Sequence, residues 1–524
     1  MSARQSLILV LLLLLPLAAA RAQTWVATPL GPGDAKLQPP EPPREFRAAW
    51  VATVANIDWP SRRDLTTAQQ QAEMKSILDA AAAMNLNALV LQVRPACDAI
   101  YPSRLEPWSE FLTGLSGRPP SPLYDPLAEW IAGAHARGIE LHAWVNPFRA
   151  RHFQSKQPDA ASHITKTRPD LVRTYGQYLW LDPGEPEART HGLAVVADLI
   201  QRYDLDGVHI DDYFYPYPEK NLSFPDDRAW NAFNATPSSP RLSRNEWRRR
   251  NIDDFVRDMY QLVKRERPHI KVGISPFGIW RPGFPPEVRG FDAFESLNAD
   301  ARRWTREGWL DYVAPQLYWK AEAPQQPFNR LLHWWIDQND QLRHVWPGVY
   351  TSRILPAELL GSKPPTDAKG RDSWEPSDIT RQIDLTRASA GGSTGHIHFS
   401  MIALMQNRRG TADALRTGPY ARPALVPASP WLAGSIAPPV APAVQITPTN
   451  AALNIAWQSP EGSSGRWTLV SWRTGDSWSH RLEPLRSGAA TLPQDGPGAA
   501  ADVIAVRSLD NLGRLGPAAV WQRR

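Results

Sequence analysis

Eight short apolar runs, most of them separated by helix-like segments, constrain the fold of this chain more than any other feature. The runs lie at residues 46–53, 88–94, 140–148, 207–212, 271–278, 312–319, 345–352 and 396–401. Helical patterns lie at residues 67–84, 126–137, 188–203, 244–265, 299–307, 328–339 and 377–390. Because most runs are apolar without clean alternation, they are typical of parallel strands buried on both faces. The pattern predicts an α/β fold, a (β/α)8 TIM-type barrel.

An open, doubly wound parallel sheet is the alternative arrangement of the same elements. Such sheets commonly carry a glycine-rich phosphate-binding loop after the first strand. The stretch after residue 53, VANIDWPS, contains no glycine. The closed barrel is therefore preferred. Thr67 and Gln70 occupy capping-box positions and are expected to begin the first helix.

The N-terminal segment has the pattern of a cleaved secretory signal. An early arginine precedes LILVLLLLLPLAAA, and a small-residue site follows at Ala20–Ala22, which predicts a signal peptide over residues 1–22. The apolar stretch is shorter than the ~20 residues that a membrane-spanning helix needs. No cysteine follows it that could carry a lipid. We therefore expect a periplasmic or secreted protein with no membrane span.

Two further shifts in composition divide the chain. Residues 23–45 form a proline-rich lead-in to a barrel domain over residues 46–420, and residues 421–443 form a Pro/Ala-rich linker. Beyond the linker, residues 444–524 contain strand-like runs at 452–457, 466–472 and 501–509. Short strands separated by turn residues predict a small all-β sandwich, with Trp457 in its core.

Charge and cysteine content exclude several classes of function. The net charge of +5 falls to +3 without residues 1–22, which is too small to indicate a nucleic-acid partner. The single cysteine, Cys97, allows neither an internal disulfide nor a cysteine-based metal site. His396 and His398 share a strand face, but the first strand lacks the histidine or aspartate cluster of barrel metallohydrolases. We expect no metal and no cofactor.

The stretch GVHIDDYFYPYP, residues 207–218, places two adjacent aspartates where the fourth strand ends. Pro216 and Pro218 cannot continue a sheet, because they lack the amide donor. The carboxyl ends of barrel strands face the site, so Asp211 and Asp212 are the candidate catalytic residues. Asp211 is expected to point toward the barrel axis, and Asp212 away from it unless the turn redirects it.

Other residues at strand ends have the chemistry of a sugar-binding site. Aromatic rings can stack on the apolar faces of sugars, and amides or charged groups can bind their hydroxyls. The candidate substrate-binding residues are Trp50, Arg94, Asp98, Trp144, Asn146, Tyr213, Tyr215, Gln316, Tyr318, Trp319 and Tyr350. Asp98, Glu106 and Glu110 are alternative sources of a second acid, while the fifth strand, KVGISPFG, ends without one.

Five segments together resemble the glycosyl hydrolase-like family ten. They are FRAAWVATVANIDWPS, LNALVLQVRPACDAIYPS, HAWVNPFRA, DLDGVHIDDYFYP and GWLDYVAPQLYW, and the resemblance spans roughly residues 45–420. It implies a (β/α)8 barrel of exported bacterial proteins, at least one of which cleaves peptidoglycan strands stripped of stem peptides. The ending SLDNLGRLGPA resembles that of a fibronectin type III-like module.

Two wider resemblances suggest roles for the aspartates. DGVHID is similar to the D-G-F-R-L-D segment of alpha-amylase-like barrels, whose nucleophile corresponds to Asp211, although His209 replaces the usual arginine. DGVHIDDYFYP is also similar to the chitinase segment D-G-x-D-x-D-x-E, but Tyr213 stands at its catalytic glutamate. Asp211 is thus a candidate nucleophile or acetamido-orienting carboxylate. Asp212 is a candidate general acid, with a pKa raised by burial among Tyr213 and Tyr215.

The sequence predicts an exported glycoside hydrolase acting on a bacterial cell-wall amino-sugar glycan. Its expected partner is a polysaccharide, a peptidoglycan strand without stem peptides, and its oligomeric state stays open. One alternative is a non-catalytic glycan-binding barrel, which the missing acid on the fifth strand favours. The other is a hydrolase of a secreted polysaccharide.

Overall fold

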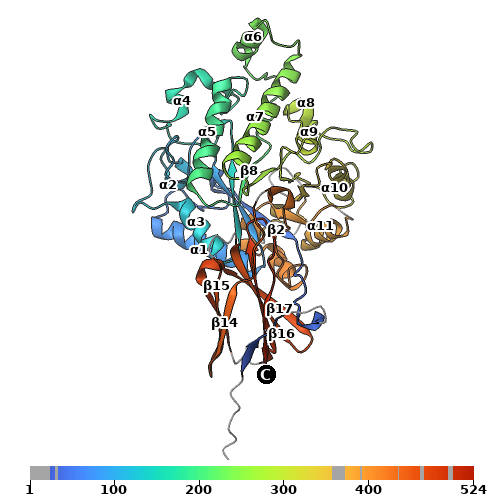
Figure 1. The fold of residues 1–524 in the computed structure, drawn as a ribbon. Helices are drawn as coiled ribbons and strands as arrows, with labels where there is room; N and C mark the ends of the chain where they lie inside the picture. The colour runs from blue at the N-terminus through green and yellow to red at the C-terminus, as the bar shows by residue number, and fades with distance from the viewer. Residues whose placement is uncertain are drawn as a thin grey trace, which may run out of the picture.

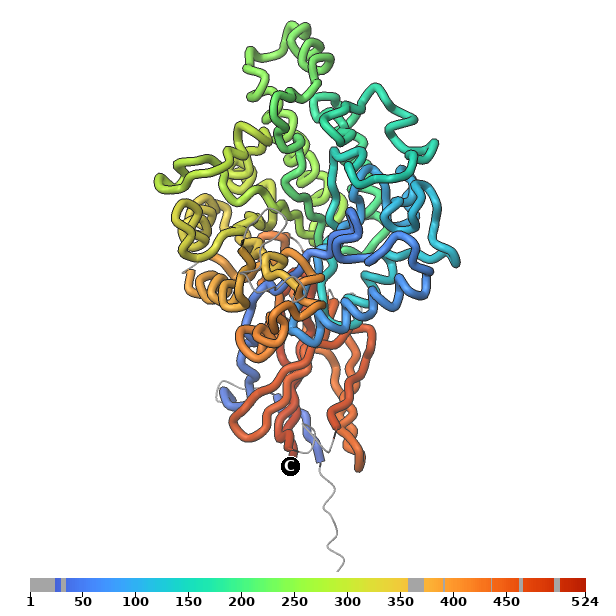
Figure 2. The backbone as a smooth tube through the Cα atoms, turned by 180° about the vertical axis from the view of Figure 1, so that it is seen from behind, coloured from blue at the N-terminus to red at the C-terminus, as the bar shows by residue number. Residues whose placement is uncertain are grey.

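The computed structural model describes residues 24–29, 34–356, 372–389, 392–434, 436–460, 465–493 and 500–524. The predicted signal peptide lies outside them. A helix-covered barrel forms one part of the molecule, and a β-sandwich lies below it (Figures 1 and 2). Within the described part of the chain, no helix is long and apolar enough to cross a membrane.

Parallel strands form the barrel in an order that closes on itself. Their order is β11 (His344–Val345), β10 (Tyr312–Val313), β9 (Lys271–Ile274), β8 (Gly207–Ile210), β4 (Glu140–Val145), β3 (Ala88–Arg94), β2 (Phe46–Val51), β13 (Gly395–His398) and β12 (Gly348–Val349). Only Trp346 and Pro347 separate β11 from β12, so the two are successive segments of one extended stretch. β11 pairs with β10 and β12 with β13, which closes the sheet and confirms the predicted barrel.

Burial on both faces explains the continuous apolar runs. Every residue of β2 and β3 is buried. Along β2, Ala48 and Trp50 belong to the cluster that fills the barrel, whereas Ala49 and Val51 pack in the layer beneath the helices. A strand with water on one face would instead need polar residues at alternate positions.

The predicted helices are present and cover the outside of the barrel (Figure 1). They are α1 (Thr67–Ala83), α3 (Pro126–His135), α5 (Pro186–Arg202), α7 (Arg244–Glu266), α9 (Ala301–Arg306), α10 (Phe328–Asp337) and α11 (Pro376–Ala388). Shorter helices are α2 (Glu110–Thr113), α4 (Ile164–Thr167), α6 (Asp227–Ala235), α8 (Ala293–Ser296), α12 (Met401–Met405) and α13 (Thr411–Thr417).

The capping box of α1 lies one residue earlier than expected. Thr66, not Thr67, has the extended backbone of an N-cap, and its hydroxyl accepts a hydrogen bond from the Gln69 amide. Thr67 is already helical, and its hydroxyl donates to the carbonyl of Pro122. The prediction of Thr67 and Gln70 was therefore wrong by one position, because two adjacent threonines offered the same signal.

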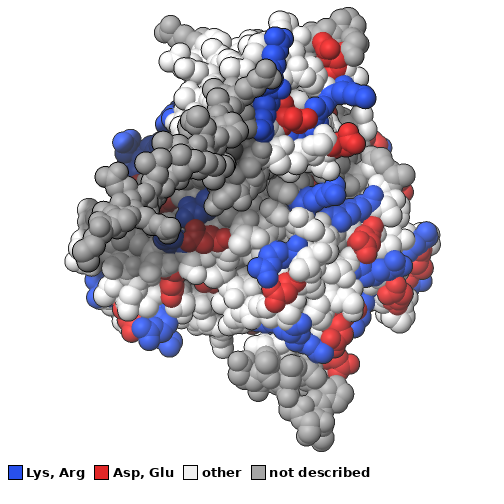
Figure 3. All heavy atoms as spheres, turned by 90° about the horizontal axis from the view of Figure 1, so that it is seen from below, with Lys and Arg blue, Asp and Glu red and all other residues white. Residues whose placement is uncertain are grey.

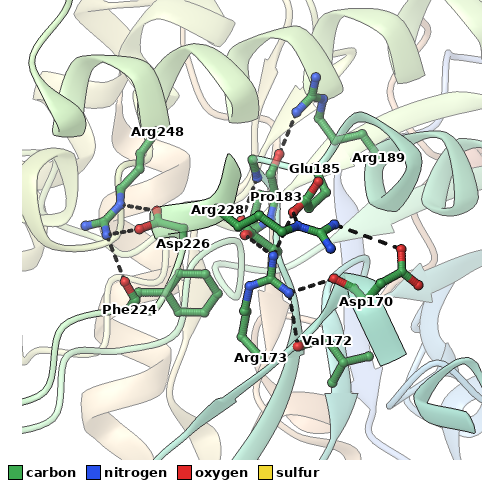
Figure 4. A network of polar contacts seen from close by, with 12 residues as sticks. Asp170, Val172, Arg173, Pro183, Glu185, Arg189, Phe224, Asp226, Arg228 and Arg248 are labelled. Atoms are coloured by element: carbon green, nitrogen blue, oxygen red, sulfur yellow. Dashed lines mark hydrogen bonds and ion pairs between the residues drawn. The ribbon is translucent and has the colours of Figure 1, made fainter. Parts of the chain in front are cut away.

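Insertions above the carboxyl ends of the strands build the upper wall of the barrel. A small sheet of β5 (Arg149–Arg151), β7 (Tyr178–Leu181) and β6 (Val172–Tyr175) follows β4, and α6 follows β8. Figure 4 shows the ion pairs that join them: Arg173 and Arg228 both bind Glu185, and Arg248 binds Asp226. Because Asp226 is fully buried, these contacts fix the loop that leaves β8.

The C-terminal part is an antiparallel sandwich, as predicted. One sheet contains β1 (Trp25–Ala27), β20 (Ala519–Arg523), β19 (Val503–Asp510), β16 (Gly465–Thr474) and β17 (Ser477–Pro484). The other contains β14 (Ala443–Pro448), β15 (Ala452–Gln458) and β18 (Ala489–Pro493). Trp457 is buried in the core between them, together with Trp25 of the lead-in.

The sandwich packs against the amino ends of the barrel strands. Arg466 of β16 forms ion pairs with Asp204 and with Asp206, which directly precedes β8. Leu482 of β17 contacts Gly138, just before β4. Seen from below, this end of the molecule carries Lys and Arg side chains interspersed with Asp and Glu (Figure 3). The carboxyl ends of the strands thus open on the opposite side.

Candidate active site

A cavity of about 280 Å³ lies at the carboxyl ends of the barrel strands. The strands or the segments directly after them supply its walls, and the longer loops supply His152 and Tyr217. The described residues that line it are Trp50, Ala52, Val54, Ile57, Trp144, Arg149, His152, Asp211, Asp212, Tyr213, Tyr217, Ser275, Gln316, Tyr318 and Phe399.

Asp211 is held by an amide whose orientation is fixed from both sides. The Nδ2 atom of Asn146 donates to both carboxylate oxygens of Asp211, each at 2.7 Å. The Oδ1 atom of Asn146 accepts from Gln92 Nε2 at 2.5 Å and from Arg149 Nη2 at 2.7 Å. An amide whose oxygen faces two donors must turn its NH2 group the other way. Asp211 therefore meets a fixed donor.

Asp212 lies beside Asp211 and shares the cavity with it. The chain leaves the strand after Ile210, so the turn brings both side chains into the lining. Asp211 is 5% exposed and Asp212 3% exposed. The hydroxyl of Tyr217 donates a short hydrogen bond to Oδ2 of Asp212. The two carboxyl groups thus enter the cavity from one strand end.

Burial raises the pKa of both carboxyl groups, and their partners separate them. Burial, followed by repulsion from Asp211, raises the pKa of Asp212 to about 7. Burial also raises the pKa of Asp211, but the charge of Arg149 and the hydrogen bond from Asn146 oppose this rise. When two carboxyl groups interact, the first proton leaves the group whose anion is better stabilised. We therefore assign the anion to Asp211 and the proton to Asp212.

Several predicted binding residues line the cavity or support it. Trp50, Trp144, Tyr213, Gln316 and Tyr318 are lining residues. The indole N–H of Trp50 donates to Nε2 of His209 at 3.2 Å, which fixes the plane of the ring. Asn146 is fully buried and acts beneath Asp211 rather than on the surface of the cavity.

The structure places other predicted residues elsewhere. Arg94 is fully buried in an ion pair with Glu106, and Asp98 accepts a hydrogen bond from the amide of Ala96 within its own loop. Tyr215 packs edge-on against Phe224, away from the cavity.

Trp319 and Tyr350 line a second cavity of about 520 Å³. Its other described lining residues include Lys320, Trp374 and Tyr318, and Tyr318 belongs to the first cavity as well. The two cavities therefore adjoin each other across one tyrosine ring.

Sequence reasoning missed Gln92, His152, Tyr217 and Phe399. Gln92 lies two positions before Arg94 on β3, so strand alternation could have placed it on the barrel-facing side. Tyr217 continues the alternation of Tyr213 and Tyr215, but only the path of the loop reveals which of the three tyrosines reaches Asp212.

Histidines form no metal centre in the part of the chain that the structure describes. These residues contain no group of three or more His, Cys, Asp or Glu side chains that could hold an ion. His396 and His398 instead both contact the hydroxyl of Tyr420.

Comparison with known proteins places this geometry in a family. The model of the family described as "Glycosyl hydrolase-like 10" matches residues 45–358, a range that holds every described lining residue of the first cavity except Phe399. The chain belongs to the glycosyl hydrolase-like 10 family. The match ends before the sandwich, so the fibronectin type III-like character of residues 444–524 stays a prediction.

Curated glycosyl hydrolases are similar to this chain over most of their length. The chain is 37% identical over 397 residues to glycosyl hydrolase YngK of Bacillus subtilis, covering 74% of each chain. It is 33% identical over 313 residues to glycosyl hydrolase DigH of Escherichia coli K12, covering 56% of this chain and 70% of the relative.

A solved structure with a related outline is the PgaB (BpsB) glycoside hydrolase domain from Bordetella bronchiseptica. It matches with a TM-score of 0.45 and 16% identity, over 71% of this chain and 98% of that one. The assignment of a barrel to this glycosyl hydrolase-like 10 member rests on its own strand pairings. Its paired acids, one charged and one protonated, can stabilise a developing cation and donate a proton.

Proposed function

We propose that this protein is an exported glycoside hydrolase that cleaves a bacterial cell-wall amino-sugar glycan, a peptidoglycan strand without stem peptides. The adjacent pair of Asp211 and Asp212 in the first cavity carries the proposal. Breaking a glycosidic bond needs a proton for the leaving oxygen and a negative group near the developing oxocarbenium ion. Asp212, with a pKa near 7, supplies the proton, and the Asp211 carboxylate supplies the charge.

Aromatic walls support a sugar as the substrate. Trp50, Trp144, Tyr213 and Tyr318 line the cavity that holds the acids. Rings of this size bind the apolar faces of pyranoses, and Gln316 offers an amide to their hydroxyls. The second cavity continues beyond Tyr318, so it can bind further sugars of a glycan chain whose cleaved bond lies in the first cavity.

Sequence features support the proposed glycan and the proposed location. The family resemblance of segments such as HAWVNPFRA and DLDGVHIDDYFYP supports a peptidoglycan strand without stem peptides. The apolar stretch within residues 1–22 supports export, because a wall glycan lies outside the cytoplasm.

The test is to incubate residues 23–524 with purified peptidoglycan strands, with and without stem peptides, and to identify soluble fragments by mass spectrometry. We expect fragments from the bare strands alone, and none with Asp211→Asn or Asp212→Asn. Asp253→Asn is the matched control, because Asp253 is similarly buried but binds Arg303 and Trp304, and none of these three residues lines the cavity. Fragments at unchanged rates from both site variants would refute the assignment of the acids.

A glycan-binding barrel without turnover is the second candidate. It is favoured by β9, which leads into Ser275 rather than an acid at the cavity. This reading predicts that bare strands are retained by the immobilised protein and by Asp211→Asn with equal affinity, and that neither form releases products.

A further inference from the structure

Both carboxyl groups of the first cavity come from the same wall. Among the described lining residues, Asp211 and Asp212 are the only acids, and they are neighbours in the chain. The neighbouring strand β9 leads into Ser275, and strands further around the barrel contribute Trp50 from β2 and Gln316 after β10. No described lining residue therefore opposes the pair with a carboxylate.

The two ordinary glycosidase mechanisms need carboxyl groups on both sides of the sugar. A retaining enzyme places a nucleophile ~5–5.5 Å from its acid, and an inverting enzyme places a base ~6.5–9.5 Å away, beyond a water molecule. In both cases the second group attacks, or activates water, on the face opposite the leaving oxygen. Adjacent side chains at one strand end do not span a sugar ring in this way.

We infer that the nucleophile is the 2-acetamido group of the sugar on the non-reducing side of the cleaved bond, oriented by Asp211, while Asp212 is the proton donor. This inference rests on the proposed function and names its reaction course. The acetamido oxygen reaches C1 from within the substrate, so the protein needs only one proton donor and one group that holds the amide.

The surroundings of Asp211 suit a group that orients rather than attacks. Its oxygens already accept Nδ2 of Asn146, and Oδ1 also accepts the amide of Tyr213 at 3.3 Å. A carboxylate has roughly four lone-pair positions, so capacity remains for one more N–H donor. A carboxylate that accepts hydrogen bonds from a fixed amide is a weaker nucleophile, because each hydrogen bond stabilises its negative charge before the reaction.

Trp144 provides a second polar group aimed at the same place. Its indole N–H is buried at the cavity wall and faces the Asp211 carboxyl, whose pKa it lowers, but it does not reach hydrogen-bonding geometry with any described residue. Buried hydrogen-bond donors normally have an acceptor. We therefore expect the indole N–H of Trp144 to find one in a bound ligand. A substrate hydroxyl or acetamido oxygen meets that need.

The reaction then balances within the substrate, two aspartates and one water molecule. The acetamido oxygen bonds to C1, the bond from C1 to the leaving oxygen breaks, and the proton of Asp212 passes to that oxygen. The resulting oxazolinium keeps its N–H on the Asp211 carboxylate. Water then adds to C1 as the bond from C1 to the acetamido oxygen breaks, and it gives a proton to Asp212; the acetamido group is restored, with retention of the anomeric configuration.

The test compares strands that differ only in the acyl group. Bare glycan strands are de-N-acetylated and then re-acylated with acetyl, monofluoroacetyl, difluoroacetyl or trifluoroacetyl groups, the re-acetylated strand being the matched control. Each fluorine weakens the carbonyl oxygen as a nucleophile, so we expect kcat/KM to fall at every step, by about tenfold or more overall. Proton NMR of the first product formed should show the retained anomer.

Three outcomes separate this inference from the proposed function. Equal rates across the acyl series, or an inverted product, would overturn the inference and leave the hydrolase in place. A glycosyl adduct on Asp211, found by mass spectrometry of peptides after reaction with a 2-deoxy-2-fluoro glycan, would do the same. Absence of cleavage of any strand would refute the proposed function itself, and the inference with it.

Discussion

Nδ2 of Asn146 lies 2.7 Å from each carboxylate oxygen of Asp211. Gln92 on β3 fixes this amide, and Gln92 in turn accepts the backbone N–H groups of Thr53 and Val54 through Oε1. The position of Asp211 after β8 is therefore set by residues on β3 and after β2 and β4.

Gln92→Glu should lower kcat with little change in KM. The substitution keeps an acceptor for Thr53 and Val54 but removes the donor to Asn146, so the amide loses one of the two bonds that fix its orientation. Misplacement of a positioned group typically costs about 100-fold in rate. Steady-state kinetics on bare strands measure this, with Gln92→Met as a comparison. An unchanged kcat would remove Gln92 from the positioning of Asp211.

The basic limb of the pH profile should report Asp212. Because its protonated form is the active one, kcat/KM should decline as the pH rises through about 7. The hydroxyl of Tyr217 stabilises the anion, so Tyr217→Phe should move the limb to higher pH. Tyr213→Phe is the control. If Tyr217→Phe leaves the limb in place, another group carries the proton.

Asp212→Asn should stabilise the protein at pH 8 and leave its stability almost unchanged at pH 4. The pKa of Asp212 is about 7 in the folded protein and 3.8 as the unperturbed value. Between these values the unfolded chain releases the proton while the folded chain retains it, so stability falls as the pH rises. Thermal unfolding at both pH values measures the difference. A lower melting temperature for the variant at pH 8 would contradict this account.

Trp319→Ala should weaken binding of long strands more than of short ones. Its ring lines the second cavity, which only a substrate extending past Tyr318 can reach. Loss of one stacking ring corresponds to about 2- to 10-fold in KM. Kinetics on strands of increasing length measure the effect, with Trp309→Ala as the control because Trp309 lies outside both cavities. Equal losses at all lengths would assign Trp319 a structural role.

Arg466→Ala should destabilise the protein without changing its activity. The ion pair between Arg466 and Asp206 is 11% and 1% exposed, and removing one partner of a buried pair costs about 3–5 kcal/mol. Arg473→Ala, whose partner Asp502 is 42% exposed, should cost at most about 1 kcal/mol. Urea denaturation compares the two. Similar losses in the free energy of unfolding would mean that Arg466 does not hold the sandwich against the barrel.

The strands could be predicted because burial on both faces leaves a continuous apolar run. β3 matches its predicted range, residues 88–94. β10 is limited to Tyr312–Val313, although its apolar run continues to Trp319, because Pro315 cannot donate to a ladder. Helix starts were harder to place: Thr66 and Thr67 carry the same side chain, and only backbone geometry distinguishes them.

The site was predictable only where position on a strand decides the outcome. Asp211 and Trp144 follow directly from strand ends. Arg94 occupies the same kind of position, but Glu106 approaches from the following loop and buries it in an ion pair. Tyr215 and Tyr217 differ by the fold of one proline-containing loop. Contacts of this kind arise from tertiary packing, which local sequence patterns do not encode.

The pairing of β1 with β20 joins Trp25 to Arg523. During translation β1 is synthesised almost a whole chain before β20. This edge strand of the sandwich therefore has no pairing partner while the barrel is synthesised. The closing cost of so long a loop rises only slowly with its length. The first sheet of the sandwich is consequently completed late, once β20 is available to pair with β1 on one side and β19 on the other.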